Sequence, residues 1–253
     1  MRPIIYTPSG RAGEYANKGY AVNLFRGCTH GCTYCYVPAM LRMSKEEFHS
    51  KVVPVKDGLK RLECDLEKLG KIDEPIFMSF TCDPYCKDAD IGITAQAITW
   101  INYRHSNNAV SILTKGRIPI KHIQYLTNNP NNKIGVTLTS MSDSFSLKIE
   151  PGASLPAERL GTLRYAHDAG IQTWASIEPV IDPMQSLKAI QYTMPYVDEF
   201  KIGKWNHNKE ADKIDWIDFM VKADELLNRN HKKYIFKKDL MDIWKKFKFG
   251  KGE

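Results

Sequence analysis

Three cysteines near the start of the chain constrain its fold and chemistry more than any other feature. Cys28, Cys32 and Cys35 have the spacing Cys-x3-Cys-x2-Cys. Three thiolates this close must turn back on one point, and Gly27 and Gly31 allow the backbone to do so. Soft thiolates select iron–sulfur clusters or zinc, and cubane clusters are usually held by four cysteines. The sequence therefore predicts a metal centre with three protein ligands and one iron left open to a small molecule.

Two other interpretations compete for these cysteines, a zinc site and a disulfide framework. A zinc site can use the same three cysteines with His30 as a fourth ligand. Structural zinc sites usually take their ligands from two separated pairs, and no second Cys-x2-Cys follows. A disulfide framework is disfavoured because a chain of 253 residues can bury a core without covalent links.

The bulk properties describe an ordinary globular chain. The length fits one domain of α/β-barrel size, and without a repeat or low-complexity linker we expect residues 1–253 to form a single domain. No apolar run approaches the roughly 18 residues of a membrane span, and no signal peptide is evident, so we expect a cytoplasmic protein with no membrane partner. The net charge of +7 favours acidic partners, nucleic acid among them, although lysine-rich solvated faces are common.

Hydrophobic patterns predict alternating strands and helices after a turn-rich cover loop at residues 1–19. Strands are expected at 19–25, 75–81, 109–114, 133–140, 171–177 and 197–202, with a possible last one at 234–236. Helices are expected at 56–69, 94–104, 118–128, 154–167, 184–194, 211–229 and 240–247. About six such alternations indicate βα units around a parallel sheet.

The three-cysteine spacing resembles the radical S-adenosylmethionine (SAM) superfamily, and Tyr34, just before the last cysteine, also fits that family and is a candidate cofactor-binding residue. The resemblance implies a partial (β/α)6 TIM-type barrel with a [4Fe–4S] cluster on Cys28, Cys32 and Cys35. It also implies that SAM chelates the open iron and is cleaved reductively to a 5′-deoxyadenosyl radical. A low-potential electron donor of flavodoxin or ferredoxin type is the implied partner. Tyr36, directly after the last cysteine, is a candidate catalytic residue.

Four further segments narrow the resemblance to the spore photoproduct lyase-like group of this superfamily. They are Ser79–Tyr85 (SFTCDPY), Leu113–Lys115 (LTK), Thr137–Ser140 (TLTS) and Glu150–Ala153 (EPGA), the last followed by Glu158 and Arg159. The resemblance makes a nucleic-acid base a candidate substrate. A peptide or small-metabolite substrate is one alternative, and a zinc- or cluster-bearing nucleic-acid-binding module is another.

Polar residues at the ends of the expected strands are candidate ligands of the cofactor. The hydroxyls can bind its amino acid or ribose groups, or merely cap turns: Ser79, Thr81, Thr139 and Ser140. Lys115 can pair with the SAM carboxylate, and Asp83 can hold its ammonium group or orient the loop. Glu178, at the end of the fifth strand, is assigned a polar role toward SAM or substrate.

The position of the hydrogen-donating cysteine of spore photoproduct lyase aligns with Phe80 here. Cys82 shares a strand face with that position and is the candidate donor, although it is equally compatible with a small buried hydrophobe. Cys86 lies further along the chain.

A basic segment at about 230–253 interleaves lysines with aromatic residues, which favours contact with unpaired bases. Leu240, Trp244 and Phe247 also have helical spacing, which instead predicts packing against the barrel.

Overall fold

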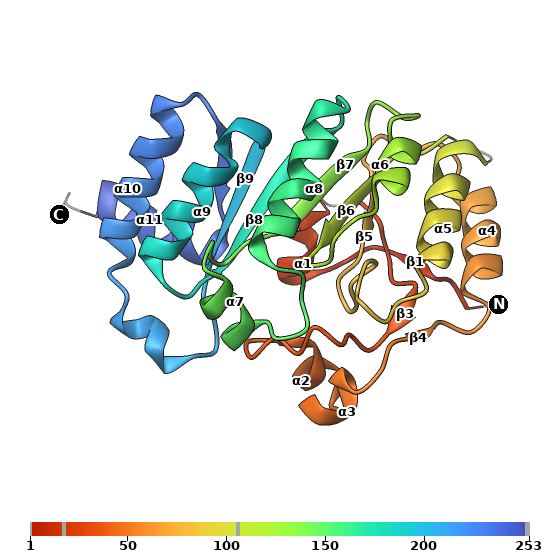
Figure 1. Ribbon diagram of the computed structural model, residues 1–253, viewed down its shortest axis with the longest axis horizontal. Coiled ribbons are helices and arrows are strands. Elements are labelled where there is room, and N and C mark those ends of the chain that lie inside the picture. The colour runs from red at the N-terminus through yellow and green to blue at the C-terminus, as the bar shows by residue number, and fades with distance from the viewer. Residues whose placement is uncertain (1, 17–18, 105–106, 251–253) are drawn as a thin grey trace.

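The computed structural model describes residues 2–16, 19–104 and 107–250, and the described chain contains an eight-stranded sheet (Figure 1). The strands, in their order across the sheet, are β1 (Ile5–Tyr6), β2 (Ala21–Val22), β5 (Ile76–Met78), β6 (Val110–Thr114), β7 (Lys133–Thr137), β8 (Gln172–Val180), β9 (Glu199–Lys204) and β10 (Lys233–Phe236). β1 runs antiparallel to β2, and all other neighbours are parallel. A short separate pair joins β3 (Phe25–Arg26) to β4 (Val53–Pro54).

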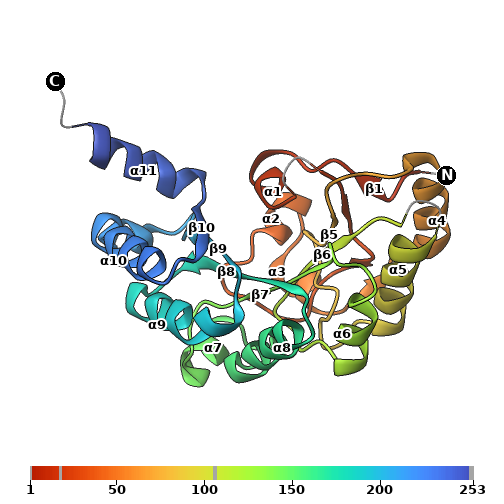
Figure 2. The ribbon, with the colours of Figure 1, turned by 90° about the horizontal axis from the view of Figure 1, so that it is seen from above.

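Helices cover the outer face of this sheet, as expected for βα units. Along that face lie α4 (Gly58–Leu69), α5 (Ile91–Tyr103), α6 (Ile120–Leu126), α8 (Pro156–Asp168), α9 (Pro183–Thr193) and α10 (Trp216–Arg229) (Figure 2). The chain ends on α11 (Lys238–Phe249), and α1 (Gly10–Tyr15) lies on the opposite, inner side of the sheet. The α/β class and the partial barrel expected from the sequence are confirmed.

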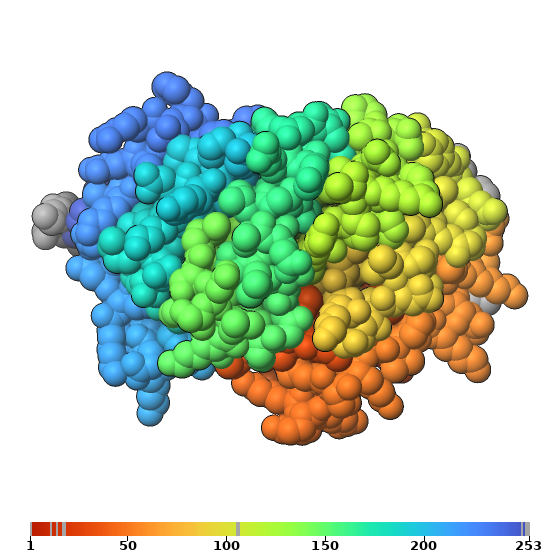
Figure 3. All heavy atoms as spheres, in the orientation of Figure 1, coloured from red at the N-terminus to blue at the C-terminus, as the bar shows by residue number. Residues whose placement is uncertain are grey.

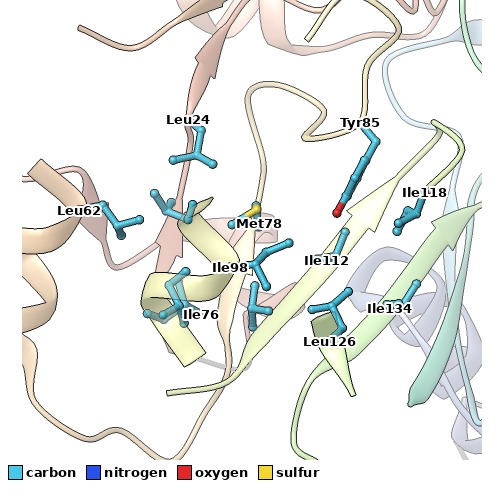
Figure 4. Close-up of a cluster of buried hydrophobic side chains, with 14 of the residues drawn as sticks. Leu24, Leu62, Ile76, Met78, Tyr85, Ile98, Ile112, Ile118, Leu126 and Ile134 are labelled. Carbon is cyan, nitrogen blue, oxygen red and sulfur yellow. The ribbon is translucent and has the colours of Figure 1, made fainter. Parts of the chain in front are cut away.

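Alternation along the strands separates the outer core from the inner face. Ile134 and Val136 of β7 are fully buried against the outer helices, whereas Gly135 between them faces inward. The outer core beneath α4, α5 and α6 is built from branched and aliphatic side chains (Figure 4). A second core beneath α8 to α11 contains Phe200, Phe219 and Trp244. The strand ends at the carboxyl edge are therefore carried by a sheet that is packed along its outer face.

An aromatic group occupies the inner face. The Tyr15 ring lies with its centroid 5.9 Å from that of Phe77 and 5.8 Å from that of Trp174. Phe77 stacks on Phe80 at 4.3 Å. Trp174 lies over Gly135, where a Cβ atom would overlap the indole ring. Helix α1 is therefore packed against the inside of the sheet.

The structure differs from the sequence-based expectations mainly in short elements. Residues 1–19, expected to be a loop, contain β1 and α1 among their described part. An additional helix, α7 (Asp143–Ile149), follows β7, and Ser142 caps its first turn by accepting a hydrogen bond from Phe145 N. The helix expected at 211–229 begins at Trp216, after the 3-10 helix η2 (Lys209–Lys213) and an Asp215 cap. Short strands and one-turn helices carry too little periodicity to be detected in a sequence.

Within the described residues, no helix combines the length and the apolar character that crossing a membrane requires.

Gly135→Ala tests the packing of the inner face. We expect the variant to lose about 1–3 kcal/mol of unfolding free energy, because the new methyl group overlaps the Trp174 indole. Urea unfolding measures this loss. The control is Gly161→Ala in α8, where a Cβ meets nothing within 4 Å and alanine improves helix propensity. Equal stability of Gly135→Ala and the parent chain would contradict the packing.

Candidate active site

The three predicted metal ligands lie in the loop between β3 and α2 (Val37–Leu41). Gly27 and Gly31 adopt φ angles of 80° and 64° there, and a Cβ at Gly27 would overlap the carbonyl oxygen of Lys51. All six cysteines of the chain are free thiols. The segment with α2 and α3 (Lys45–His49) forms one edge of the molecule, shown in orange (Figure 3).

The EPGA segment packs directly on this cysteine loop. Thr33 N donates to Ile149 O at 2.9 Å, and Gly152 N donates to His30 O at 2.8 Å. A Cβ at Gly152 would overlap the carbonyl oxygen of Thr29. The glycine of the segment is therefore required by close contact between two backbones.

Glu150 connects the EPGA segment to the sheet through a buried ion pair. Its carboxylate pairs with Arg159 Nη2 at 2.7 Å, and both side chains are almost completely buried. Arg159 also donates to Thr137 O at 2.9 Å, which ties the pair to the end of β7. Tyr34 donates its hydroxyl to Glu150, and burial together with this carboxylate raises the pKa of Tyr34. The tyrosine before the last cysteine thus joins the cysteine loop to the sheet.

Asp83 is the centre of a second buried network. It accepts hydrogen bonds from Thr114 Oγ1 at 2.6 Å and Lys115 N at 2.7 Å. His30 Nε2 lies 2.9 Å from Asp83 Oδ2, the same oxygen that accepts from Lys115 N. Burial opposes a charge on His30, but Asp83 outweighs it and raises the pKa of His30 to about 10. Of the two roles expected for Asp83, these contacts correspond to orienting the loop.

Lys115 supplies a cation beside the cysteines. Burial lowers its pKa, but the neighbouring Cys32 and Glu150 outweigh burial, so the pKa of Lys115 is raised. Its ammonium group also lies 5.7 Å from the centroid of the Tyr34 ring. Burial raises the pKa of Cys32 to about 12, so a bound metal would have to displace its proton.

The residues after β5 contribute a hydroxyl and a thiol. Ser79 Oγ donates to Cys82 O at 2.8 Å and lies 3.2 Å from Cys82 Sγ. Burial raises the pKa of Cys82 to about 11, which keeps the thiol protonated at neutral pH. Thr81 is fixed through its backbone, whose N–H donates to Asn23 Oδ1 at 3.1 Å.

The two candidate cofactor ligands after β7, Thr139 and Ser140, differ in the hydrogen bonds of their hydroxyls. Ser140 donates to Gln185 Oε1 at 2.8 Å, which ties the strand end to α9. Thr139 is buried, and its hydroxyl has no hydrogen-bond partner among the described residues. A buried orphan hydroxyl is costly unless a ligand or water satisfies it.

Glu178 belongs to a group on the inner face. Lys237 Nζ lies 3.0 Å from its carboxylate, and Tyr15 donates its hydroxyl to the same side chain. The Lys237 ammonium also lies 4.0 Å from the centroid of the Tyr15 ring. Tyr36, the other aromatic candidate, is half exposed and donates to Phe80 O at 3.2 Å.

Sequence reasoning missed Tyr15 and Lys237. Tyr15 was within the expected cover loop, where no periodic signal marks a short helix. Lys237 was counted with the basic C-terminal segment, although it directly follows β10. Lys115 and Glu178 were identified because they lie at the ends of expected strands. The same criterion could have identified Lys237, which follows β10.

Arg159→Met tests the anchoring of the cysteine loop. We expect a loss of about 3–5 kcal/mol of unfolding free energy, because the variant leaves the Glu150 carboxylate buried without its partner. Adding Glu150→Gln should restore part of that loss, since the stranded charge is removed. Lys222→Met breaks the exposed pair with Asp218 and should cost less than about 1 kcal/mol. Equal losses in the buried and exposed variants would show that the Glu150–Arg159 pair is not a structural anchor.

The donor set fits the cofactors expected from the sequence. Three free thiols sit in a loop turned by two glycines, a cation stands beside them, and an orphan hydroxyl lies at a neighbouring strand end. Thiolates are the ligands that iron–sulfur clusters take, and a zwitterion needs both a cation and hydrogen-bonding groups.

The sequence and the fold were each compared with known proteins, and the two comparisons give consistent results. An uncharacterized protein of Methanocaldococcus jannaschii is 26% identical over 172 residues, which are 68% of this chain and 64% of that protein. An uncharacterized protein of Acidianus two-tailed virus is 25% identical over 197 residues, 71% of this chain and 62% of that protein. The chain therefore spans less than two thirds of the length of these curated relatives.

Among solved structures, a spore photoproduct lyase variant has a TM-score of 0.59 at 16% identity, covering 82% of this chain and 62% of that chain. Streptococcus suis SuiB bound to S-adenosylmethionine has a TM-score of 0.58 at 12% identity, covering 86% and 49%. At these identities the likeness concerns the fold. The radical SAM superfamily model matches residues 22–194, from the end of β2 to the end of α9, and the chain therefore belongs to the radical SAM superfamily of enzymes.

Proposed function

We propose that this chain cleaves SAM reductively at a [4Fe–4S] cluster held by Cys28, Cys32 and Cys35 and that the resulting radical takes a hydrogen atom from a nucleic-acid base. The observation that carries the proposal is the partly buried Lys115 at the carboxyl end of β6, whose ammonium group lies 5.7 Å from the ring centroid of Tyr34, directly before Cys35. When bound, the cluster supplies the electron that breaks the C5′–S bond of SAM. A flavodoxin- or ferredoxin-type protein is the proposed source of that electron.

Several residues of the chain have roles in holding SAM under this proposal. Lys115 provides a fixed positive charge for the SAM carboxylate, since its raised pKa keeps it protonated. Thr139 offers its unpartnered hydroxyl to the ribose or amino group. Asp83 orients the Thr114–Lys115 strand end, because its oxygens are already engaged. Ser79 and Ser140 hold the strand ends on either side.

Three further residues are placed toward substrate. Cys82 carries a proton at neutral pH, which is the form that a hydrogen-atom donor requires. Glu178 presents a carboxylate on the inner face and is oriented by Lys237 and Tyr15. Tyr36 is half exposed beside the last cysteine and is the proposed contact at the entrance.

Part of the basic C-terminal segment supports a nucleic-acid substrate. Phe236 and Trp244 pack in the core, so these two rings are not available to stack on bases. Lys245, Lys246 and Lys248 are exposed on α11, with Phe247 between them 41% exposed. The side chain of Phe249 and residues 251–253, with Lys251, lie outside the described residues. A cationic helix with one exposed aromatic ring suits phosphate and base contacts.

A peptide or small metabolite is the second candidate substrate. It is favoured by the fold of Streptococcus suis SuiB bound to precursor peptide, which has a TM-score of 0.60 at 12% identity. Methylornithine synthase has a TM-score of 0.56 at the same identity. These values are close to that of the spore photoproduct lyase variant.

Alanine variants of the cysteines test the cluster assignment. After anaerobic reconstitution we expect Cys28→Ala, Cys32→Ala and Cys35→Ala to lose most of their iron, because a ligand is removed from the site. Cys64→Ala should keep its iron, since Cys64 lies in α4 outside the loop. Iron analysis and formation of 5′-deoxyadenosine from SAM and dithionite measure the result. Full iron in Cys32→Ala, or a loaded parent chain that forms no 5′-deoxyadenosine, would overturn the proposal.

Charge reversal on α11 tests the substrate class. We expect Lys245→Glu, Lys246→Glu and Lys248→Glu together to weaken binding of single-stranded DNA and to reduce the salt dependence of log K by about 2, because three phosphate contacts are lost. The matched control reverses the exposed Lys60, Lys121 and Lys188 on α4, α6 and α9, which changes the net charge equally. Fluorescence anisotropy at several salt concentrations measures both. Equal weakening in the two triple variants would assign the binding to net charge rather than to α11.

A further inference from the structure

One cysteine of the loop takes part in a second cluster of metal-binding side chains. The ligand atoms of Cys28, His30 and Cys86 all lie within 4.8 Å of one another. Cys86 Sγ lies 4.0 Å from His30 Nδ1. Cys86 and His30 are buried, at 1% and 2% exposed, and Cys28 is partly buried. In a tetrahedral zinc site the ligand atoms are roughly 3.5 Å apart, so small side-chain rotations would bring these three onto one ion.

We propose that Cys28, His30 and Cys86 bind Zn²⁺ in the cluster-free chain, and that this zinc withholds Cys28 from the three-cysteine site. Two thiolates and one imidazole are ligands that zinc accepts, with water completing the tetrahedron. These three ligands differ from the zinc site considered in the sequence analysis, which combines His30 with Cys28, Cys32 and Cys35.

The environment of His30 is the second observation for this site. Its Nε2 atom faces Asp83 Oδ2 at 2.9 Å, and Asp83 is itself held by Thr114 and the backbone of Lys115. Histidines that ligate a metal usually have a carboxylate beside their other ring nitrogen, as His30 has here at ion-pair distance. The arrangement leaves Nδ1 turned toward Cys86, with Gly152 O at 3.2 Å. His30 is therefore oriented to present one nitrogen to the site.

Cys86 is also fixed in position. Thr29 N lies 3.2 Å and Thr29 Oγ1 lies 3.1 Å from its sulfur, so the cysteine loop and the loop after β5 meet at this thiol. Hydrogen bonds of this kind favour a thiolate, the form that binds metal. Cys32 and Cys35 do not belong to this group of ligand atoms.

Binding involves proton release and no change of oxidation state. Zn²⁺ takes the place of the thiol protons of Cys28 and Cys86 and of any proton on His30 Nδ1. Because Cys28 can serve one site at a time, zinc and the cluster exclude each other. The zinc site does not depend on the proposed reaction, since it concerns the chain before cluster assembly.

The experiment uses the full-length, reduced, cluster-free chain and Zn²⁺ in competition with a chromophoric chelator. We expect one zinc per chain and a loss of affinity of at least about tenfold in Cys86→Ser, which removes a ligand. Cys35→Ser and Cys64→Ser are the matched controls and should change the affinity less than about threefold, within ordinary context effects. With Co²⁺ in place of zinc, Cys86→Ser should lose roughly half of the thiolate charge-transfer absorption, because one of two sulfur ligands is gone.

A second measurement follows iron uptake. Zinc-loaded parent chain should take up less iron during reconstitution than the parent chain without zinc, whereas Cys86→Ser should be insensitive to zinc. Circular dichroism confirms that each variant is folded, and alanine at the same position replaces serine in any variant that is not. Zinc affinity that falls in Cys35→Ser but not in Cys86→Ser would assign the metal to the three-cysteine loop. Zinc affinity unchanged in all variants would assign it elsewhere, and either result overturns the proposal.

Discussion

The contact between two backbones, at residues 149–152 and 29–33, is the constraint on which the rest of the site depends. Two backbone hydrogen bonds join the segments, and Gly152 leaves no room for a side chain. Under the proposed cluster assignment, this loop places three thiols around one centre and cannot also supply a core of its own. The position of the loop is therefore set by the sheet, through Glu150, Arg159 and the end of β7. The buried ion pair suits this purpose because its partners are held by hydrogen bonds as well as by charge.

Charge balance is the second requirement of such a loop. Cysteine sulfurs that become thiolates on binding a metal would repel one another in this partly buried loop, and the Glu150 carboxylate lies nearby. Lys115 and Arg159 provide the compensating positive charges: Lys115 directly follows β6, and Arg159 of α8 donates to Thr137 O at the end of β7. Asp83 positions Lys115 through its backbone N–H rather than through its ammonium group. The ammonium group therefore remains available to face the cysteines and a ligand.

The large features of the fold were predictable from the sequence because they rest on periodicity and on cysteine spacing. Helices α4 and α10 bury repeated apolar positions, and such long patterns have few alternative explanations. Helix α1 and β1 span only a few residues, so their pattern carried no signal. The proximity of Cys86 to Cys28 arises from the packing of the loop after β5 on the cysteine loop, which no local pattern records. Trp244 shows the reverse case: its helical spacing with Leu240 correctly indicated burial against the sheet.

The inner-face group explains how an open sheet can enclose a reaction space. Helix α1 follows β1 at one edge of the sheet, and Lys237 follows β10 at the other edge. Tyr15 of α1 and Lys237 meet at Glu178 of β8, where the hydroxyl and the ammonium group both bind one carboxylate. The two edges are thus linked by side chains across the inner face, although no strand pairing closes the barrel among the described residues. This linkage places a carboxylate paired with an ammonium group on the same face as the strand ends that carry Lys115 and Thr139. A partial barrel of this kind holds its polar groups in place while leaving the carboxyl edge open for cofactor and substrate.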